Sequence, residues 1–271
     1  MKNKKMIVMD LDGTLLNINH ECSRKTRKYL KKLKDLGYII VIATGRVLRS
    51  AVEVTNGAEF ANYVVASAGA VVYNMDKSMM VMEKKINLNL VRKICSNYNQ
   101  DEIRCMNICN LFYHYKYMNS QNYCSAFERR ISNIDSFLND TNNIVNVTVH
   151  ANDNSLIDKY YDMFKREELE LLIMQDSFGT EKCLEIFDKG VSKYNAIKVI
   201  MEKENIKNEN VIAFGDGLND VDMIRLSGIG VAMGNALDDV KEVSDYITIS
   251  HNDDGVIYFL REYFKENNLV T

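Results

Sequence analysis

Short apolar runs alternate with amphipathic segments at both ends of this 271-residue chain. Met6–Met9 and Tyr38–Ala43 are continuous apolar runs, as a strand buried on both faces requires, and Ser23–Leu36 between them has helical spacing. A strand, a helix and a strand with short connections favour a parallel pair with a right-handed crossover. The same alternation returns in residues 192–264. We therefore predict an α/β chain whose two ends build one doubly wound parallel sheet.

The middle of the chain follows a different pattern, in which short strands and helices alternate less regularly. We expect an α+β unit with a mixed sheet backed by helices, inserted between the two halves of the parallel sheet. The predicted domains are residues 1–84 with 189–271, and residues 85–188. The strands expected in the insertion are Ile103–Met106, Leu111–Tyr115, Ile144–His150, Leu169–Met174 and Cys183–Phe187, and the helices are Leu88–Tyr98, Ser120–Leu138 and Ser155–Phe164.

Composition and charge exclude several classes of protein. The formal net charge of −3 argues against wrapping nucleic acid, which requires a clustered excess of Lys and Arg. No segment approaches the roughly 20 apolar residues of a membrane span, and no signal-peptide-like stretch precedes Asp10, so we expect a cytoplasmic protein with no membrane partner. The six cysteines form no CxxC pair and are expected to be buried thiols.

Carboxylates follow two of the predicted core strands. Asp10 and Asp12 come directly after the first strand, and Asp216 and Asp220 follow the strand predicted at Val211–Phe214. Ligands of open α/β sheets bind beyond the carboxyl ends of the strands, so these side chains should crowd together if the strands adjoin. Several ionised carboxylates at close range require a counter-ion. With only oxygen ligands in these loops, Mg²⁺ is favoured over Zn²⁺ or copper.

The neighbouring loops offer groups that bind phosphate. Thr44 supplies a hydroxyl and Gly45 a backbone amide, and a Gly-containing turn at Gly13 adds further amides. A helix should begin near Ser192, which places a helix N-terminus and the Lys193 side chain within reach of an anion. Each of these features is common by itself, and together they predict a phosphate site beside the carboxylates.

Taken in order, these segments resemble the four motifs of the haloacid dehalogenase superfamily. The motifs are Asp10-Leu11-Asp12-Gly13-Thr14-Leu15, Thr44 in Ala-Thr-Gly-Arg, Lys193 in Lys-Gly-Val-Ser-Lys, and Gly215-Asp216-Gly217-Leu218-Asn219-Asp220. The long insertion is similar to the large α/β cap of the Cof-type phosphatase branch. The resemblance spans nearly the whole chain and implies a Rossmann-like core, with a cap that closes over the site and selects the leaving group.

The resemblance also implies a reaction, the hydrolysis of small phosphate monoesters such as sugar phosphates or phosphorylated cofactors. Asp10 would be the nucleophile that forms an aspartyl-phosphate, and Asp12 the general acid and base. Mg²⁺ would be held by the Asp10 side chain, the Asp12 carbonyl and Asp216, with Asp220 nearby. The phosphoryl oxygens would be bound by Thr44, Gly45, Lys193 and Asn219.

Two alternatives stay open at this point. A phosphomutase would use the same Asp10 and Asp12 but return the phosphoryl group to a sugar, and a non-catalytic regulator would only bind a phosphorylated metabolite. The segment Ser67–Ala70 departs from the Asn-Gly-Ala expected in this branch, which leaves the substrate open. Arg46 is expected to close a helix N-terminus or to make a surface contact. The sequence does not predict an oligomeric state.

Overall fold

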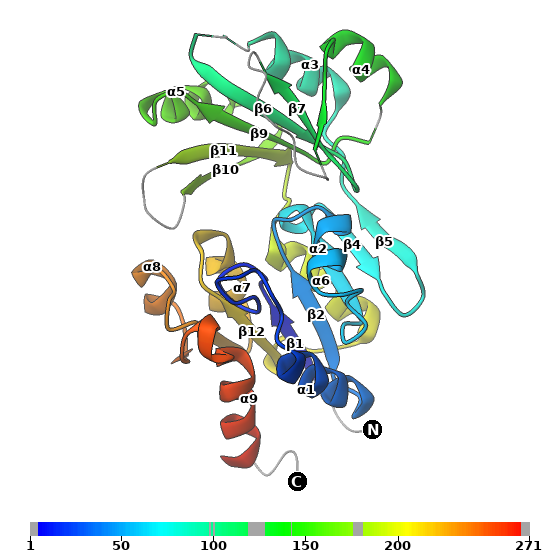
Figure 1. Cartoon of the computed structure of the whole chain (residues 1–271), viewed down its shortest axis with the longest axis vertical. Coiled ribbons are helices and arrows are strands. Elements are labelled where there is room, and N and C mark those ends of the chain that lie inside the picture. The colour runs from blue at the N-terminus through cyan, green and yellow to red at the C-terminus, as the bar shows by residue number, and fades with distance from the viewer. Residues whose placement is uncertain are drawn as a thin grey trace. The chain divides into compact units, whose positions relative to one another are not determined.

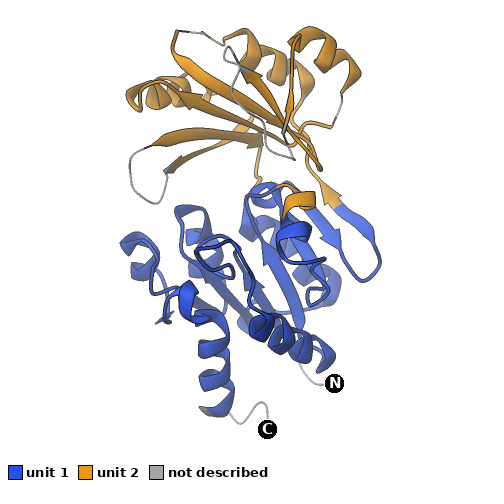
Figure 2. Cartoon of the chain, viewed as in Figure 1, with its two compact units in different colours: residues 1–46, 51–81, 192–271 blue, residues 47–50, 82–191 orange. Residues whose placement is uncertain are grey.

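The computed structural model describes residues 5–97, 99, 101–118, 128–141, 143–175 and 181–266. These residues fall into two compact units, coloured separately in Figure 2. The first comprises residues 1–46, 51–81 and 192–271, and the second comprises residues 47–50 and 82–191. The predicted boundaries lie a few residues from these breaks, and the assignment of residues 85–188 as a separate domain stays a prediction. Across the described ranges, no helix has the length and apolar character needed to cross a bilayer.

The first unit is built on an eight-stranded sheet with the order β14-β13-β12-β1-β2-β3-β4-β5 (Figure 1). Neighbours from β14 to β3 are parallel, and β4 pairs antiparallel with β3. This confirms the predicted doubly wound parallel sheet. The strands are β1 (Met6–Met9), β2 (Ile39–Ala43), β3 (Tyr63–Ala66), β4 (Val71–Asn74), β5 (Met79–Glu83), β12 (Val211–Gly215), β13 (Ile229–Ala232) and β14 (Tyr246–Ile247).

Side-chain caps fix where the helices of this unit begin. Ser23 accepts a hydrogen bond from the Thr26 amide, and Ser192 accepts one from the Asn195 amide. Both were predicted as helix starts, because a serine oxygen satisfies an amide that lacks a partner in the first turn. The helices are α1 (Arg24–Asp35), α2 (Leu48–Val54), α6 (Lys193–Glu204), α7 (Val221–Leu226), α8 (Asp238–Glu242) and α9 (Gly255–Glu266), with 3-10 turns η1 (Ser67–Gly69), η2 (Asn208–Asn210), η3 (Leu218–Asp220) and η4 (His251–Asp253).

The second unit is a six-stranded sheet with the order β10-β11-β9-β6-β7-β8. All its neighbours are antiparallel except β7 and β8, so the sheet is mixed as predicted. Apolar side chains of the sheet, such as Ile108, Val147 and Ile186, pack with Val91 and Phe164 of the helices. The strands are β6 (Ile103–Cys109), β7 (His114–Met118), β8 (Glu128–Arg130), β9 (Asn146–Ala151), β10 (Leu169–Gln175) and β11 (Lys182–Asp188), and the helices are α3 (Leu88–Ser96), α4 (Ile134–Asp140) and α5 (Ser155–Phe164).

One predicted helix of the insertion is wrong over part of its length. Residues 128–130 of the expected Ser120–Leu138 helix form strand β8, which pairs with β7. Asn133 then accepts a hydrogen bond from the Ser136 amide and starts α4 as a new helix. An N-cap inside the expected helix therefore marks a break that helical spacing alone does not reveal. The rest of that prediction, residues 120–127, lies outside the described residues.

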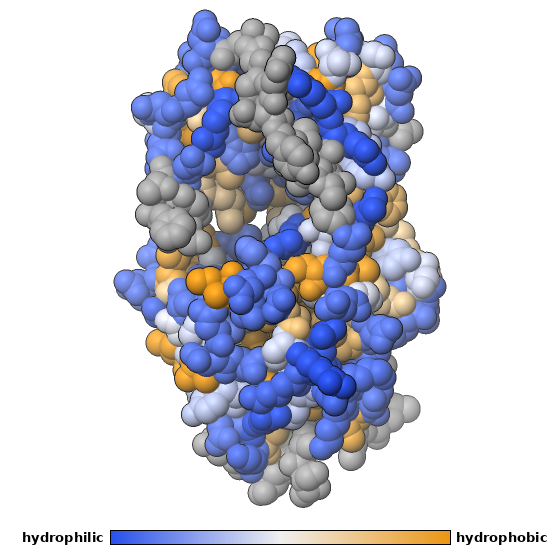
Figure 3. Space-filling view, in the orientation of Figure 1, coloured by the Kyte–Doolittle hydropathy of each residue, from blue (hydrophilic) through white to orange (hydrophobic). Residues whose placement is uncertain are grey.

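The surface is mainly hydrophilic on the face drawn in Figure 3, where hydrophobic residues appear in separate small patches.

The core strands account for much of what is buried, since every residue of β1, β3 and β12 is buried. Burial on both faces is what the continuous apolar runs predict. The polar residues that follow these strands are therefore held at the edge of a rigid sheet.

Candidate active site

The acidic residues predicted to meet lie at the carboxyl ends of two adjacent strands. β1 and β12 are parallel neighbours with Met9 opposite Phe214, and the Asp10 amide donates to the Phe214 carbonyl at 3.0 Å. Asp10 therefore ends one strand beside the start of the Asp216 loop. Carboxylate oxygens of Asp10, Asp216 and Asp220 all lie within 4.8 Å of one another. We call these three residues the acidic cluster.

Lys193 lies inside the acidic cluster. Its ammonium group donates to Asp10 Oδ1 at 2.5 Å and to Asp220 Oδ1 at 2.7 Å, and it lies 3.4 Å from Asn219 Oδ1. The Lys193 side chain is only 1% exposed. It is the first residue of α6, so the Ser192 cap that begins the helix also sets the direction of the lysine. Lys193 therefore contacts Asp10 and lies near Asn219, while the phosphate-binding roles expected of Lys193 and Asn219 stay predictions.

Burial and repulsion perturb the titration of this site. Burial raises the pKa of Asp10 well above its ordinary value, and the charges of Asp220 and Asp216 add to the effect against the opposing charge of Lys193. Burial, followed by the charge of Asp220, raises the pKa of Asp216 to about 6. Burial opposes the charge of Lys193, but Asp10 and Asp220 outweigh it and raise the pKa of the lysine. One lysine does not fully compensate three carboxylates, two of them buried and one partly buried, so the site favours additional positive charge.

Main-chain and hydroxyl donors hold the acidic side chains in place. Asp220 Oδ2 accepts from the amides of Asp216 and Gly217, each at 3.1 Å, and the Thr14 hydroxyl donates to Asp216 Oδ1 at 2.7 Å. Gly13 has φ +79°, and a Cβ there would lie 2.1 Å from Asp216 Oδ2. The turn after β1 therefore requires glycine for its left-handed backbone and for its close approach to Asp216.

Asp12 points to a different partner. Its carboxylate receives two hydrogen bonds from Arg46, from Nε to Oδ2 at 2.7 Å and from Nη2 to Oδ1 at 2.6 Å. His20 Nδ1 lies 3.4 Å from the same Oδ1, and the Asp12 side chain is 43% exposed. Burial works against the charged form of Asp12, but the hydrogen bonds and charge of Arg46 outweigh it and lower the pKa. The Asp12 side chain is therefore not a member of the acidic cluster.

Thr44 follows β2, the strand on the other side of β1. It is 1% exposed, and its hydroxyl accepts from the Arg46 amide at 3.1 Å, while Gly45 is exposed.

Sequence reasoning missed Thr14 and underrated Arg46. Thr14 was visible as part of Asp-Gly-Thr, but its partner lies 202 positions away. Arg46 was expected to close a helix N-terminus or to make a surface contact, and its guanidinium forms a partly exposed ion pair with Asp12.

A strained turn adjoins the Thr44 loop. Ser67, Ala68 and Gly69 have φ of +48°, +52° and +110°, although only glycine adopts this region readily. The amides of Ser67 and Ala68 donate to the carbonyls of Arg46 and Thr44 at 2.9 and 3.0 Å. A Cβ at Gly69 would lie 2.2 Å from the Ser192 carbonyl oxygen. The turn therefore ties the Thr44 loop to the start of α6, where Lys193 lies.

Comparison with known proteins agrees with this geometry. A family model for haloacid dehalogenase-like hydrolases matches residues 7–260. The chain is 29% identical over 266 residues to the 5-amino-6-(5-phospho-D-ribitylamino)uracil phosphatase YitU of Bacillus subtilis, covering 96% of this chain and 97% of the relative. YcsE of the same organism, which has the same phosphatase name, is also 29% identical, with 96% and 95% covered.

Solved structures share the fold. The crystal structure of TM0651 from Thermotoga maritima superposes with a TM-score of 0.77 at 28% identity, covering 96% of this chain and 97% of that chain. The family match spans both sheets and includes all the strand-end residues described above. The chain therefore belongs to the haloacid dehalogenase-like hydrolases, as its four motifs predict.

Proposed function

We propose that this protein hydrolyses small phosphate monoesters through an aspartyl-phosphate on Asp10. The observation that carries the proposal is the contact between Asp10 and the buried Lys193 within the acidic cluster. Lys193 holds one oxygen of Asp10, which leaves the other to attack phosphorus. Relatives named as phosphatases align along almost the full chain, which supports this reaction over other chemistries of the family.

We infer the remaining roles from the places of these residues in the family's motifs. Asp12, two residues beyond the nucleophile, is proposed to protonate the leaving oxygen and then to activate water. Thr44, Gly45, Lys193 and Asn219 are proposed to bind the phosphoryl oxygens and to stabilise the charge that spreads over them in the transition state. Arg46 keeps Asp12 in a fixed position between these steps.

A divalent cation fits the acidic cluster. Three carboxylates within 4.8 Å, two of them with raised pKa values, form an all-oxygen donor set that favours a hard ion. We propose Mg²⁺ held by the side chains of Asp10 and Asp216 and by the Asp12 main-chain carbonyl, with Asp220 close by. The ion would supply charge neutralisation for the incoming phosphate.

The relatives suggest where to look for the substrate. YitU and YcsE are named for a phosphate ester on a ribityl chain attached to a pyrimidine. We propose a phosphorylated sugar or sugar alcohol of this kind, and that residues 85–188 select its leaving group. A panel of phosphorylated metabolites with Mg²⁺ should place such compounds above nucleotides and phosphorylated amino acids in kcat/KM.

Asp10→Asn provides the direct test. Asparagine keeps the shape of the side chain but is a far weaker nucleophile, so we expect orthophosphate release from p-nitrophenyl phosphate to fall by at least about 10³-fold. Asp238→Asn is the matched control, because that carboxylate is 95% exposed and lies outside the cluster. The control should keep wild-type activity, and both variants should unfold cooperatively on heating.

Two results would count against the proposal. Undiminished activity of pure Asp10→Asn protein would exclude the nucleophile. An isomeric sugar phosphate instead of orthophosphate as the main product would assign a mutase.

A further inference from the structure

Positive charge is concentrated on α1, although the protein as a whole is acidic. Seven of the twelve residues of this helix are Lys or Arg, and only Asp35 is acidic, in a chain with a net charge of −3. Four of the seven cations have no acidic partner among the described residues. Arg24, Arg27, Lys28 and Lys32 form no ion pair with an acidic side chain among the described residues, whereas Lys34 is paired with Asp76. The helix therefore carries uncompensated charge.

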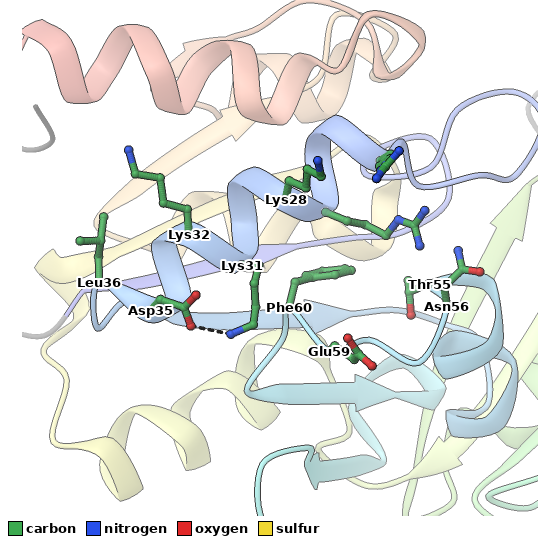
Figure 4. Close-up of a pocket in the computed structure, with 11 residues that line it drawn as sticks. Lys28, Lys31, Lys32, Asp35, Leu36, Thr55, Asn56, Glu59 and Phe60 are labelled. Carbon is green, nitrogen blue, oxygen red and sulfur yellow. Dashed lines mark hydrogen bonds and ion pairs between the residues drawn. The ribbon is translucent and has the colours of Figure 1, made fainter.

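A cavity of about 590 Å³ lies along this basic helix. Its walls are α1 and the segment of residues 55–60, both within the first unit, and Figure 4 shows the Phe60 ring beneath the helix. We call it the α1 cavity. Five basic side chains line it against two acidic ones, and one of the five, Lys31, is paired with Asp35. Its volume is typical of small-molecule sites, and none of its lining residues belongs to the acidic cluster.

Arg27, which lines this cavity, is not fully hydrogen-bonded. The Nε of Arg27 is buried and has no hydrogen-bond partner among the described residues. Because this Nε has almost no accessible surface, a ligand in the cavity would meet the terminal Nη donors of the Arg27 guanidinium and its charge, which no acidic side chain among the described residues pairs with. Arg24, Arg27, Lys28 and Lys31 recur at spacings of three and four residues and so share one side of α1.

We propose that the α1 cavity binds a small molecule carrying two or more phosphate groups. The basic row from Arg24 to Lys32 is about 12 Å long at 1.5 Å per residue, which suits an extended polyanion better than a single phosphate. Arg27 supplies directed donors, and Lys28 and Lys32 supply charge that stays available because no acidic side chain neutralises it. This site is independent of catalysis at Asp10.

The proposal is tested by calorimetric titration of the full-length protein with sodium tripolyphosphate. EDTA is added to remove divalent cations. We expect saturable binding that weakens at least about tenfold in Arg27→Gln/Lys28→Gln, because charge-assisted hydrogen bonds are lost. Lys25→Gln/Lys207→Gln removes the same charge from side chains that do not line the cavity, and it should bind within about twofold of wild type. Lys28→Gln/Lys32→Gln, at two exposed positions, repeats the test if Arg27 proves necessary for folding.

Four results would overturn the inference. Absence of binding to the wild type would show that the cavity is not a polyphosphate site. Equal weakening in the cavity and control variants would show that only net charge matters. Full binding by both cavity variants would place the anion elsewhere. Tighter binding of a short single-stranded RNA than of tripolyphosphate, lost in the same cavity variants, would replace the small molecule with a nucleic acid.

Discussion

Replacing Asp216 with Asn should stabilise the metal-free protein while removing its response to Mg²⁺. Asp216 has its pKa raised to about 6 by burial and by the charge of Asp220, so the folded protein disfavours its ionised form. Asparagine has nearly the same shape and carries no charge. Its carbonyl oxygen can still accept the hydrogen bond that the Thr14 hydroxyl gives to Asp216. The substitution therefore removes repulsion without opening a gap.

The size of the effect follows from the pKa. Raising it from 3.8 to about 6 costs the folded state about 3 kcal/mol once the group is ionised, at 1.36 kcal/mol per factor of ten. Because Asp216 is partly exposed, we expect about 1–2 kcal/mol after solvent screening. Below pH 3.8 Asp216 is protonated in the folded and unfolded states, so the cost is absent. As the pH rises through about 6, Asp216 ionises in the folded state and the wild type loses this amount of stability. The Asn variant should thus gain nothing near pH 4 and gain fully at neutral pH.

Urea unfolding in EDTA at about pH 4 and about pH 7.5 measures both limits. Asp238→Asn is again the control, and its stability should change little at either pH. Added Mg²⁺ should then stabilise the wild type by mass action and leave Asp216→Asn unchanged. A variant that is less stable than wild type at neutral pH, or equally stabilised at both pH values, would refute the electrostatic account of this cluster.

Two further substitutions test the geometry of the site. Arg46→Gln should lower kcat for an alkyl phosphate by about 10²-fold and lower kcat for p-nitrophenyl phosphate far less. The reason is that only the alkyl leaving group needs the proton that a positioned Asp12 provides. Steady-state kinetics on both esters measures the difference. Gly13→Ala should lower kcat/KM at least about 10²-fold by displacing Asp216. The control is Gly37→Ala, at a similarly positive φ but with no atom within 4 Å of the added Cβ. This control should keep its activity and lose only about 1 kcal/mol of stability in urea unfolding.

Each of these predictions has an outcome that contradicts it. Equal losses on both esters would mean that Arg46 acts through substrate binding or folding instead of through Asp12. Full activity of Gly13→Ala would show that the turn after β1 relaxes freely, and inactivity of Gly37→Ala would show that backbone strain anywhere in the unit abolishes function.

The strands and their terminal acids were predictable because burial leaves a simple record in the sequence. A strand covered on both faces is a continuous apolar run, so a sudden Asp10 marks its end, and parallel strands bring such ends to one edge. The choice of which side chains pair with each other leaves no comparable pattern in the sequence. Arg46 and Asp12 lie 34 positions apart on flexible side chains, and nothing in either segment specifies the pair. The break before β8 was missed for a related reason, since β8 depends on pairing with β7.

The pairing of β1 with β12 sets the order in which the protein can assemble. A ribosome delivers the chain from its N-terminus, and domains generally fold as units while synthesis continues. β1 can pair with β2 early, but its other edge has no neighbour until β12 has emerged, long after residues 82–191 are complete. Pairing across so long a stretch is slow. Until β12 is made, Asp10 therefore lies beside an unpaired strand edge. The active site can form only during the last third of translation.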